Sequence, residues 1–259
     1  MSPSSREWAP GTVGEPAGWQ RRVEEFVLGR VGPPPARVLE VGCGEGWLAR
    51  GLARAGHSVT AIDPRAPEGP IFRRVGIEGF SDPERFDHVV AILSLHHVGD
   101  LERALDKVVD SLRHGGTLVV VEFAWDRIDE ATAEWALGRL SAAPPSGEHS
   151  SWLERCCRGR ARGDEGGGHG HEDHAGAHSV GWAEQGFHDA ERLRAELDRR
   201  FVGRLFAWVP YLYPELDEAT SEADERAAID AGAINATGFR YVGVLAPEGD
   251  PSAGTPRGR

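Results

Sequence analysis

Short apolar runs alternate with stretches of helical spacing along the first half of the chain. The runs have the length of buried strands, and we expect strands at residues 37–41, 58–62, 71–75, 86–93 and 117–123. Helical spacing predicts helices at 19–30 and 47–55, and a third from Leu101 to a stop at Gly115-Gly116. Strands that alternate with helices are typical of a parallel sheet covered by helices on both faces.

The pattern changes in the second half of the chain. A helix is predicted at 128–140, and the Gly-, Ser- and His-rich stretch 141–180 predicts a long flexible insertion. Regular elements then return as a helix at 189–200, a strand at 201–209, a polar helix at 217–231 and a last strand at 239–245.

Three alternate glycines, Gly42, Gly44 and Gly46, follow the first apolar run. Glycine allows a tight turn whose backbone approaches a ligand closely. Glu40 lies near the end of that run, and Asp63 closes the next one, about twenty residues after the first glycine. Because neighbouring parallel strands end at one edge of the sheet, we expect both acids to lie beside the turn, where Asp63 can accept hydrogen bonds from both hydroxyls of a ribose.

The glycine spacing also indicates which nucleoside binds. A dinucleotide fingerprint, G-x-G-x-x-G, would place its third glycine at position 47, where this chain has Trp47. Glu40 would repel a pyrophosphate, but it suits a ligand that carries a positive centre and an amino group.

The motif E-x-G-x-G-x-G from Glu40 to Gly46, together with Asp63 further along the chain, resembles motif I and the ribose-binding acid of the class I S-adenosylmethionine-dependent methyltransferases. The resemblance covers most of residues 37–123 and extends to the end of the chain. It implies a doubly wound, Rossmann-like α/β fold of seven strands with an antiparallel last strand, and S-adenosyl-L-methionine as cofactor. The residues that it implies for cofactor binding are Glu40, Gly42, Cys43, Gly44, Gly46, Asp63, Pro64, Ile77, Glu78, Leu93 and Ser94.

Several of these side chains also have an ordinary structural interpretation. Glu78 either accepts a hydrogen bond from the adenine amino group or lies in a solvated turn, and Cys43 can simply fill the turn. Tyr211 and Tyr213 either line a substrate pocket or pack in the core with their hydroxyls at the surface.

Candidate catalytic groups follow the fourth and fifth predicted strands. His96 and His97 titrate near neutrality and suit a general base, but they can equally pack against the cofactor or cap the next helix. Glu122 ends the fifth strand at the same edge, where it either holds or deprotonates a substrate, or is a structural acid.

Composition limits the partners. The net charge of −12 argues against nucleic acid, and a run of eighteen apolar residues, which a membrane-spanning helix needs, is missing. Residues 1–18 lack a secretory core, and three cysteines make no disulfide framework, so we expect a cytoplasmic protein. The insertion contains four histidines that suggest a metal site: His169, His171, His174 and His178. The surrounding glycines favour a solvated tract instead, so we expect no metal.

The sequence therefore predicts a methyltransferase domain over residues 19–246 that methylates a small molecule by in-line displacement. Within it we expect the flexible insertion at 141–180 and an inserted helical segment at 210–237, with disordered ends at 1–18 and 247–259. Two alternatives remain at this point: a nicotinamide-dependent oxidoreductase, and a non-catalytic protein that binds a nucleoside or a metal.

Overall fold

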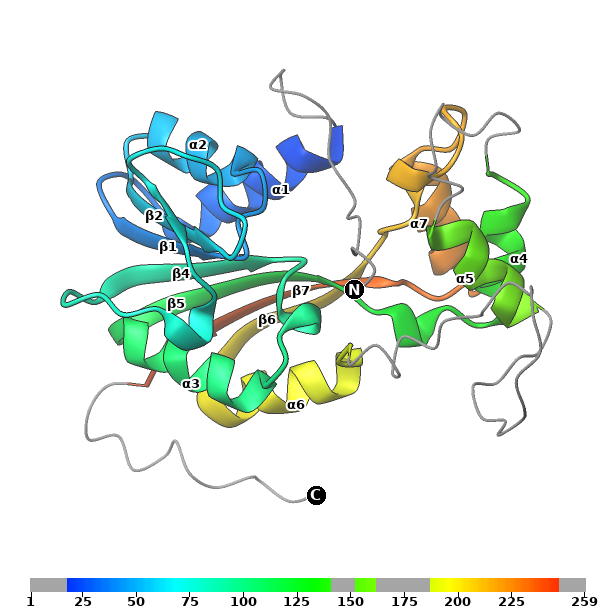
Figure 1. Cartoon of the computed structure of the whole chain (residues 1–259). Helices are drawn as coiled ribbons and strands as arrows, with labels where there is room; N and C mark the ends of the chain where they lie inside the picture. Colours follow the sequence, from blue (N-terminus) through cyan, green and yellow to red (C-terminus); the bar gives the residue numbers. More distant parts are fainter. Residues whose placement is uncertain (1–17, 141–151, 162–186, 247–259) are drawn as a thin grey trace, which may run out of the picture.

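The computed structural model describes residues 18–140, 152–161 and 187–246, which are arranged around a seven-stranded sheet (Figure 1). The strand order is β3-β2-β1-β4-β5-β7-β6. The strands are β1 (Arg37–Val41), β2 (Ser58–Asp63), β3 (Phe72–Arg74), β4 (Phe86–Ile92), β5 (Leu112–Phe123), β6 (Val202–Val209) and β7 (Gly238–Val244). Only β7 runs against its neighbours, β5 and β6, among the described strands. The predicted sheet with an antiparallel last strand is confirmed.

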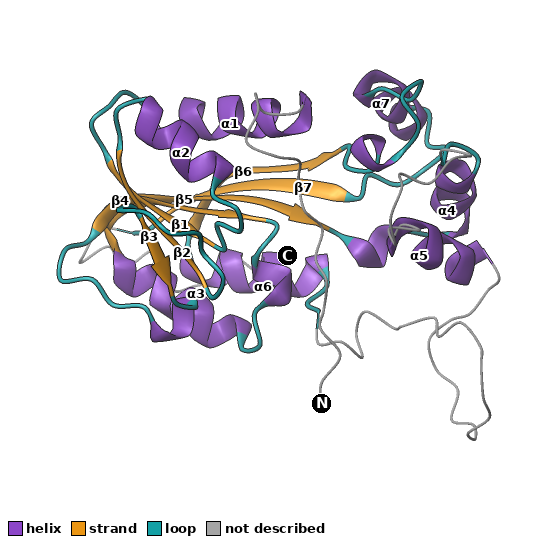
Figure 2. Ribbon diagram, turned by 45° about the horizontal axis from the view of Figure 1, so that its top comes forward, coloured by secondary structure: helices purple, strands orange, loops and turns teal. Residues whose placement is uncertain are grey.

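Helices cover both faces of this sheet (Figure 2). On one face lie α1 (Gly18–Val31) and α2 (Trp47–Arg54), whose apolar sides pack with β1, β2 and β4. On the other face lie α3 (Leu101–Ser111) and α6 (Ala190–Arg200), which form the largest apolar core together with β4, β5 and β7. Burial of these two apolar layers is the main driving force for the fold.

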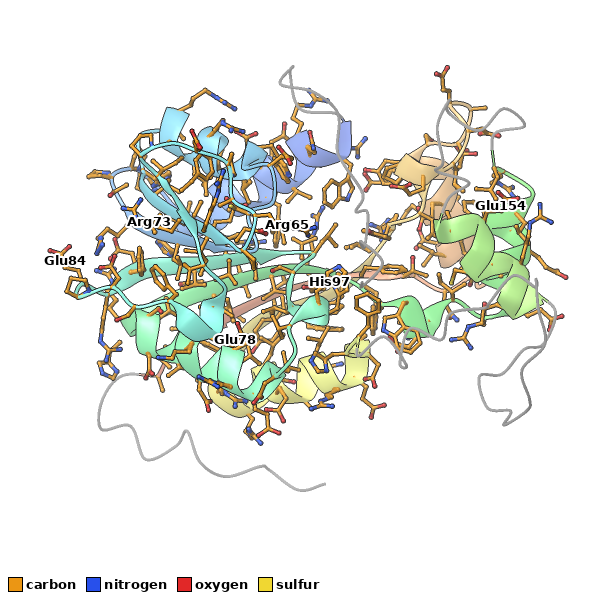
Figure 3. The ribbon with its side chains drawn as sticks, viewed as in Figure 1. Arg65, Arg73, Glu78, Glu84, His97 and Glu154 are labelled. Carbon is orange, nitrogen blue, oxygen red and sulfur yellow. The ribbon has the colours of Figure 1, made fainter. Side chains whose placement is uncertain are left out.

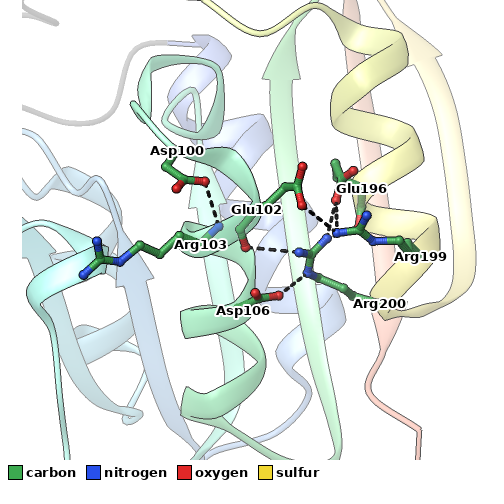
Figure 4. A network of polar contacts seen from close by, with 7 residues as sticks. All are labelled: Asp100, Glu102, Arg103, Asp106, Glu196, Arg199 and Arg200. Atoms are coloured by element: carbon green, nitrogen blue, oxygen red, sulfur yellow. Dashed lines mark hydrogen bonds and ion pairs between the residues drawn. The ribbon is translucent and has the colours of Figure 1, made fainter.

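A network of charged side chains joins α3 to α6 along their outer edge (Figure 4). The Arg200 guanidinium donates to the Asp106 carboxylate at 2.7 Å and to the Glu102 carbonyl oxygen at 3.1 Å, and it pairs with Glu196 on its own helix. Arg199 pairs with the Glu102 carboxylate at 3.2 Å. The two helices therefore contact each other through apolar side chains on their inner side and through ion pairs on their outer side.

Three further helices lie together beyond the carboxyl ends of β5 and β6: α4 (Glu130–Leu137), α5 (Trp152–Ala161) and α7 (Glu222–Asp230) (Figures 1 and 2). The first two share a separate apolar cluster with Phe123 and Leu212, to which α5 contributes Leu153 and Cys157. This group of helices extends the molecule past the edge at which the site was predicted.

Four sequence predictions of secondary structure need correction. The α3 helix ends at Ser111, and Gly115-Gly116 lie inside β5, where their backbone pairs with Leu245 after β7. The helix predicted from residue 128 begins at Glu130, because the Asp129 side chain accepts from the Thr132 N–H and caps it, and it ends at Leu137.

The polar helix predicted at 217–231 is shorter, because a capping box of Ser221 and Asp224 starts it at Glu222. The prediction of a flexible insertion over 141–180 is wrong for Trp152–Ala161, which form α5. The rest of that insertion, with its histidine tract, and the predicted disordered ends lie outside the described residues, except Gly18, which begins α1.

Helices of the described ranges are too short or too polar to cross a membrane. In the same ranges, three or more His, Cys, Asp or Glu side chains do not gather in any arrangement that suits a metal ion.

Candidate cofactor and acceptor site

The three glycines after β1 all adopt left-handed backbone conformations, with φ of 73° at Gly42, 48° at Gly44 and 75° at Gly46. Side chains at two of these positions would collide with the protein itself. A Cβ at Gly42 would lie 2.3 Å from the Ser94 Cβ, and one at Gly46 would lie 2.3 Å from the Phe72 ring. A Cβ at Gly44 would meet no heavy atom within 4 Å. Gly44 is therefore where the turn is open to a ligand.

The two predicted acids lie beside this turn. In the β1–β2 register, Glu40 is opposite Ala61, and Ile62 accepts the N–H groups of Gly42 and Cys43 at 2.8 and 3.0 Å. The Asp63 carboxylate accepts the Gly44 N–H at 3.1 Å and the Arg65 N–H at 2.7 Å. The structure thus brings the acidic ends of both strands together around Gly44, as the spacing predicted.

Glu40 is almost fully buried, with 3% of its surface exposed. The pKa of its carboxyl is raised to about 8, chiefly by burial and also by the nearby charge of Asp63, against a hydrogen bond from the Ala49 backbone and the charge of Arg50. Its Oε2 atom has no hydrogen-bond partner in the protein. A buried acceptor without a partner is costly unless a ligand supplies a donor, so this atom is suited to a cationic amino group.

Cys43 is buried inside the turn, and its Sγ lies 3.7 Å from the Gly44 carbonyl oxygen. Burial and the two neighbouring acids raise the pKa of the thiol far above its usual range. The thiol therefore stays protonated at neutral pH, as expected of a residue that fills space.

The candidates for the adenine contact lie beside the second and third strands. Ile77 and Glu78 form a short 3-10 helix, η1 (Ile77–Gly79), in which Ile77 is buried and Glu78 is partly exposed. A Cβ at Gly76 would lie 3.1 Å from the Glu78 carboxylate and 3.9 Å from Pro64, so Glu78 and Pro64 flank the same backbone. Glu78 is labelled in Figure 3, and its 3-10 helix contacts α3.

The turn after β4 contains the next candidates. Leu93 has φ of 50°, the single positive φ among the non-glycine residues that the structure describes, and this conformation costs about 1 kcal/mol or more. The Ser94 hydroxyl donates to the Val41 carbonyl oxygen at 2.9 Å. That bond and the close approach to Gly42 tie this turn to the glycine turn.

Glu122 holds the same turn from β5. It is fully buried, and its carboxylate accepts the N–H groups of Ser94 and Leu95 at 2.9 and 2.6 Å. Its second oxygen lies 2.5 Å from Nδ1 of His96. Of the alternatives for Glu122, this arrangement supports an internal acid that positions the turn and the imidazole.

His96 and His97 lie in the 3-10 helix η2 (Leu95–His97), and their rings pack together with the ring of Phe187. Their ring centroids are 4.0 Å apart, and the Phe187 ring lies 4.6 Å from that of His97. A carboxylate at Nδ1 of His96 favours the neutral tautomer that carries its proton there, which leaves Nε2 as the acceptor. The pKa of His97 is lowered to about 4, chiefly by desolvation and also by the neighbouring His96 and Arg65, against the charge of Glu122 (Figure 3).

A hollow lies between α1, the turn after β4 and the segment after β6. We call it the outer pocket, and its lining residues are Trp19, Leu93, Tyr211, Pro214 and Glu215. The Trp19 ring lies 6.2 Å from that of Trp47, directly after the glycine turn, and 6.4 Å from that of Tyr211. The outer pocket is therefore lined by the β4 turn through Leu93, and its residue Trp19 packs against Trp47, the first residue after the glycine turn.

Sequence reasoning missed two residues of this region. Trp19 is only the first residue of the helix predicted at 19–30, and Glu225 is one of several acids in the polar helix predicted at 217–231. The Pro-Tyr-Leu-Tyr-Pro stretch from Pro210 to Pro214 was a usable signal, because prolines at both ends of an aromatic run indicate a fixed turn.

The described residues fit an adenosyl sulfonium cofactor. The open Gly44 backbone leaves room for it, the unpartnered Glu40 oxygen suits its amino group, and the Asp63 carboxylate keeps lone pairs for ribose hydroxyls. A pyrophosphate would meet two acids at this position.

Comparisons with known proteins agree with this chemistry. A family model described as a methyltransferase domain matches residues 15–157, more than half of the chain. An uncharacterized methyltransferase of Mycobacterium tuberculosis is 34% identical over 133 residues, covering 44% of this chain and 66% of that protein. A ubiquinone biosynthesis O-methyltransferase of Xanthomonas campestris is 36% identical over 110 residues, covering 36% of this chain and 46% of the relative.

These alignments therefore span less than two thirds of the relatives' lengths. Among solved structures, an S-adenosylmethionine-dependent methyltransferase of Mesorhizobium loti superposes with a TM-score of 0.51 at 18% identity, covering 86% of this chain and 96% of that one. This likeness shows that the two proteins share a fold.

Proposed function

The chain belongs to the methyltransferase domain family, as a class I S-adenosylmethionine-dependent methyltransferase, and we propose that it transfers a methyl group to a small-molecule acceptor. The observation that carries the proposal is the open Gly44 backbone between the acids Glu40 and Asp63. S-adenosylmethionine supplies a methyl group on a sulfonium that is already activated for in-line displacement. The protein then has to hold, orient and desolvate the reacting groups.

We assign the cofactor contacts as follows. Glu40 binds the amino group, Asp63 binds the ribose, and the backbone of the glycine turn (Gly42, Cys43, Gly44 and Gly46) passes beneath the nucleoside. Pro64, Ile77 and Glu78 border the adenine, while Leu93 and Ser94 border the methionine portion.

A base is needed only if the acceptor must lose a proton. In that case an imidazole nitrogen of His96 or His97 would take the proton while the acceptor's electron pair forms the bond to the methyl carbon, whose bond to sulfur would break and leave the neutral thioether S-adenosylhomocysteine. His96 is the better candidate, because Glu122 fixes its tautomer with Nε2 as the acceptor, whereas a pKa of about 4 makes His97 a weak base. Glu122 acts through His96 as a positioning residue.

A small acceptor is supported by charge and by one relative. The net charge of −12 disfavours nucleic acid. The Xanthomonas relative is named for ubiquinone biosynthesis, which concerns a small molecule. We further infer that residues 19–246 form one methyltransferase domain. Within it, the segment 210–237 contributes to the binding site of the methyl acceptor.

Calorimetric titration of the full chain with S-adenosylmethionine, S-adenosylhomocysteine and NAD tests this function. We expect both adenosyl ligands to bind one to one and NAD to bind at least a hundredfold more weakly. Binding of NAD alone, or of none of the three ligands, would contradict the proposal.

A further inference from the structure

The segment after β6 is built as a rigid wall, although it belongs to no strand or long helix at Tyr211 and Leu212. The Glu225 carboxylate on α7 accepts three consecutive backbone N–H groups there: those of Tyr211 at 2.9 Å, Leu212 at 3.2 Å and Tyr213 at 2.8 Å. Glu225 is itself fully buried. Hydrogen bonds from three backbone N–H groups to one buried carboxylate hold the backbone of this segment in place, and with it the position of the Tyr211 side chain.

The Tyr211 ring is fixed from two sides as well. One face stacks on Phe123, with centroids 4.6 Å apart and planes at 23°, and the Trp19 ring meets it nearly perpendicularly, at 87°. The ring is nevertheless partly exposed, and it lines the outer pocket together with Trp19 and Leu93. The pocket thus has two aromatic walls at a fixed angle.

The remaining lining residues restrict the charge of a ligand. None of the five side chains of the outer pocket is basic, and Glu215 is acidic. An anionic ligand would therefore gain no ion pair from these residues. A flat ring, in contrast, gains about 0.5–1.5 kcal/mol from each well-placed aromatic neighbour in addition to the burial of its surface.

We propose that the outer pocket binds the methyl acceptor and that this acceptor is a flat aromatic molecule without negative charge, which packs against Trp19 and Tyr211 beside Leu93. Glu225 is the positioning residue of this site. The inference rests on the proposed methyl transfer, because it takes the pocket beside the β4 turn as the acceptor's place.

Three probes with closely related skeletons test the ligand class. They are 2-naphthol, which is flat and neutral, decahydro-2-naphthol, which is neutral but not flat, and 2-naphthoate, which is flat and anionic. Dissociation constants are measured by ligand-detected NMR on the full chain saturated with S-adenosylhomocysteine. We expect 2-naphthol to bind at least tenfold more tightly than either other probe. Equal affinities, or binding of none of the three, would overturn the proposal.

Variants locate the binding. Trp19→Leu and Glu225→Gln should each weaken 2-naphthol at least fivefold, while Trp19→Phe, which keeps an aromatic wall, should retain most of the affinity. Trp208→Leu is the matched control, since Trp208 lies on β6 against Phe206 and Arg127 and lines neither the outer pocket nor the glycine turn. Unchanged affinity in Trp19→Leu would overturn the proposal even if Glu225→Gln fails to fold.

Binding of S-adenosylhomocysteine distinguishes failure of the proposed function from failure of the aromatic-acceptor proposal alone. All folded variants should bind it with wild-type affinity. If the wild type does not bind it, the proposed function fails and this inference with it. If the wild type binds it but shows no preference for 2-naphthol, only the aromatic acceptor is refuted.

Discussion

The turns after β4 and β6 are each held by one buried glutamate, but the two glutamates come from different layers of the molecule. Glu122 lies on β5, next to β4 in the sheet, and binds both backbone N–H groups and the His96 side chain. Glu225 lies on α7, outside the sheet, and binds the backbone N–H groups of three successive residues.

This difference separates the proposed site into two halves: a cofactor half, formed by the glycine turn and the β4 turn, and an acceptor half, formed by the β6 turn and the outer pocket. The β4 turn is fixed by the sheet and contacts the glycine turn through Ser94, so that the cofactor half depends on the central strands. The backbone of the β6 turn is fixed from the helical segment, and it touches the central strands through the stack of Tyr211 on Phe123. An enzyme fold that keeps one cofactor and changes acceptors benefits from this division.

Glu122→Gln should have the largest effect and should test whether the two halves are independent. The amide nitrogen cannot accept the hydrogen bonds that one carboxylate oxygen accepts now, and the loss should lower the free energy of unfolding by about 3 kcal/mol. Because Ser94 packs against Gly42, affinity for S-adenosylhomocysteine should fall as well.

Urea unfolding and calorimetry measure both quantities, and Glu225→Gln is the control. It should lower stability by a smaller amount, about 2 kcal/mol, and leave cofactor affinity unchanged. If Glu225→Gln weakens the cofactor as much as Glu122→Gln does, the two halves are coupled and the comparison is wrong.

Glu40 should make the cofactor half respond to pH. At pH 7 its carboxyl, with a pKa of about 8, is mostly protonated in the free protein, and a bound cationic amino group should ionise it. Binding should therefore release a proton, and the heat of binding should differ between phosphate and Tris buffers. The same heat in both buffers, or a difference that persists in Glu40→Gln, would refute this role.

The same group links stability to pH. Since its pKa in the folded protein lies above the usual value of 4.5, the folded state holds the proton more strongly than the unfolded state does. The free energy of unfolding should therefore fall as pH rises from about 4.5 to 8, and it should fall less in Glu40→Gln. Urea unfolding across this range is the measurement.

Arg200→Met should have the smallest effect, because it lies away from both turns. The substitution keeps the apolar stem but removes the pairs with Asp106 and Glu196, and we expect a loss of about 1 kcal/mol. Affinity for S-adenosylhomocysteine should not change. A large loss of affinity would show that general destabilisation, rather than the local anchors, explains the effects of the other variants.

The cofactor half was largely predictable because its signals are local in the sequence. The apolar runs before Gly42 and Asp63 gave the two strands, and parallel pairing then placed Glu40 and Asp63 at one edge. The sequence pattern did not show that the three glycines of the turn have different roles. Gly42 and Gly46 face Ser94 and Phe72, contacts that only the folded chain brings together.

The acceptor half was less predictable because its determinants are contacts between distant segments. Glu225 looks like any acid of a polar helix, and its burial depends on a turn more than ten residues earlier. Helix α5 was missed because a Gly- and His-rich sequence surrounds it, although Leu153 and Cys157 give it an apolar side that packs with α4.

The most direct test of where the cofactor lies compares alanine substitutions at two glycines that both have a left-handed backbone conformation. Gly44 and Gly32 both have positive φ, at 48° and 70°, and an added Cβ would meet no protein atom within 4 Å at either position. Calorimetry with S-adenosylhomocysteine on Gly44→Ala should show affinity at least tenfold weaker than the wild type, while Gly32→Ala, after α1, should bind as the wild type does. Equal affinities in the two variants would contradict the claim that the cofactor lies against the open backbone of the glycine turn.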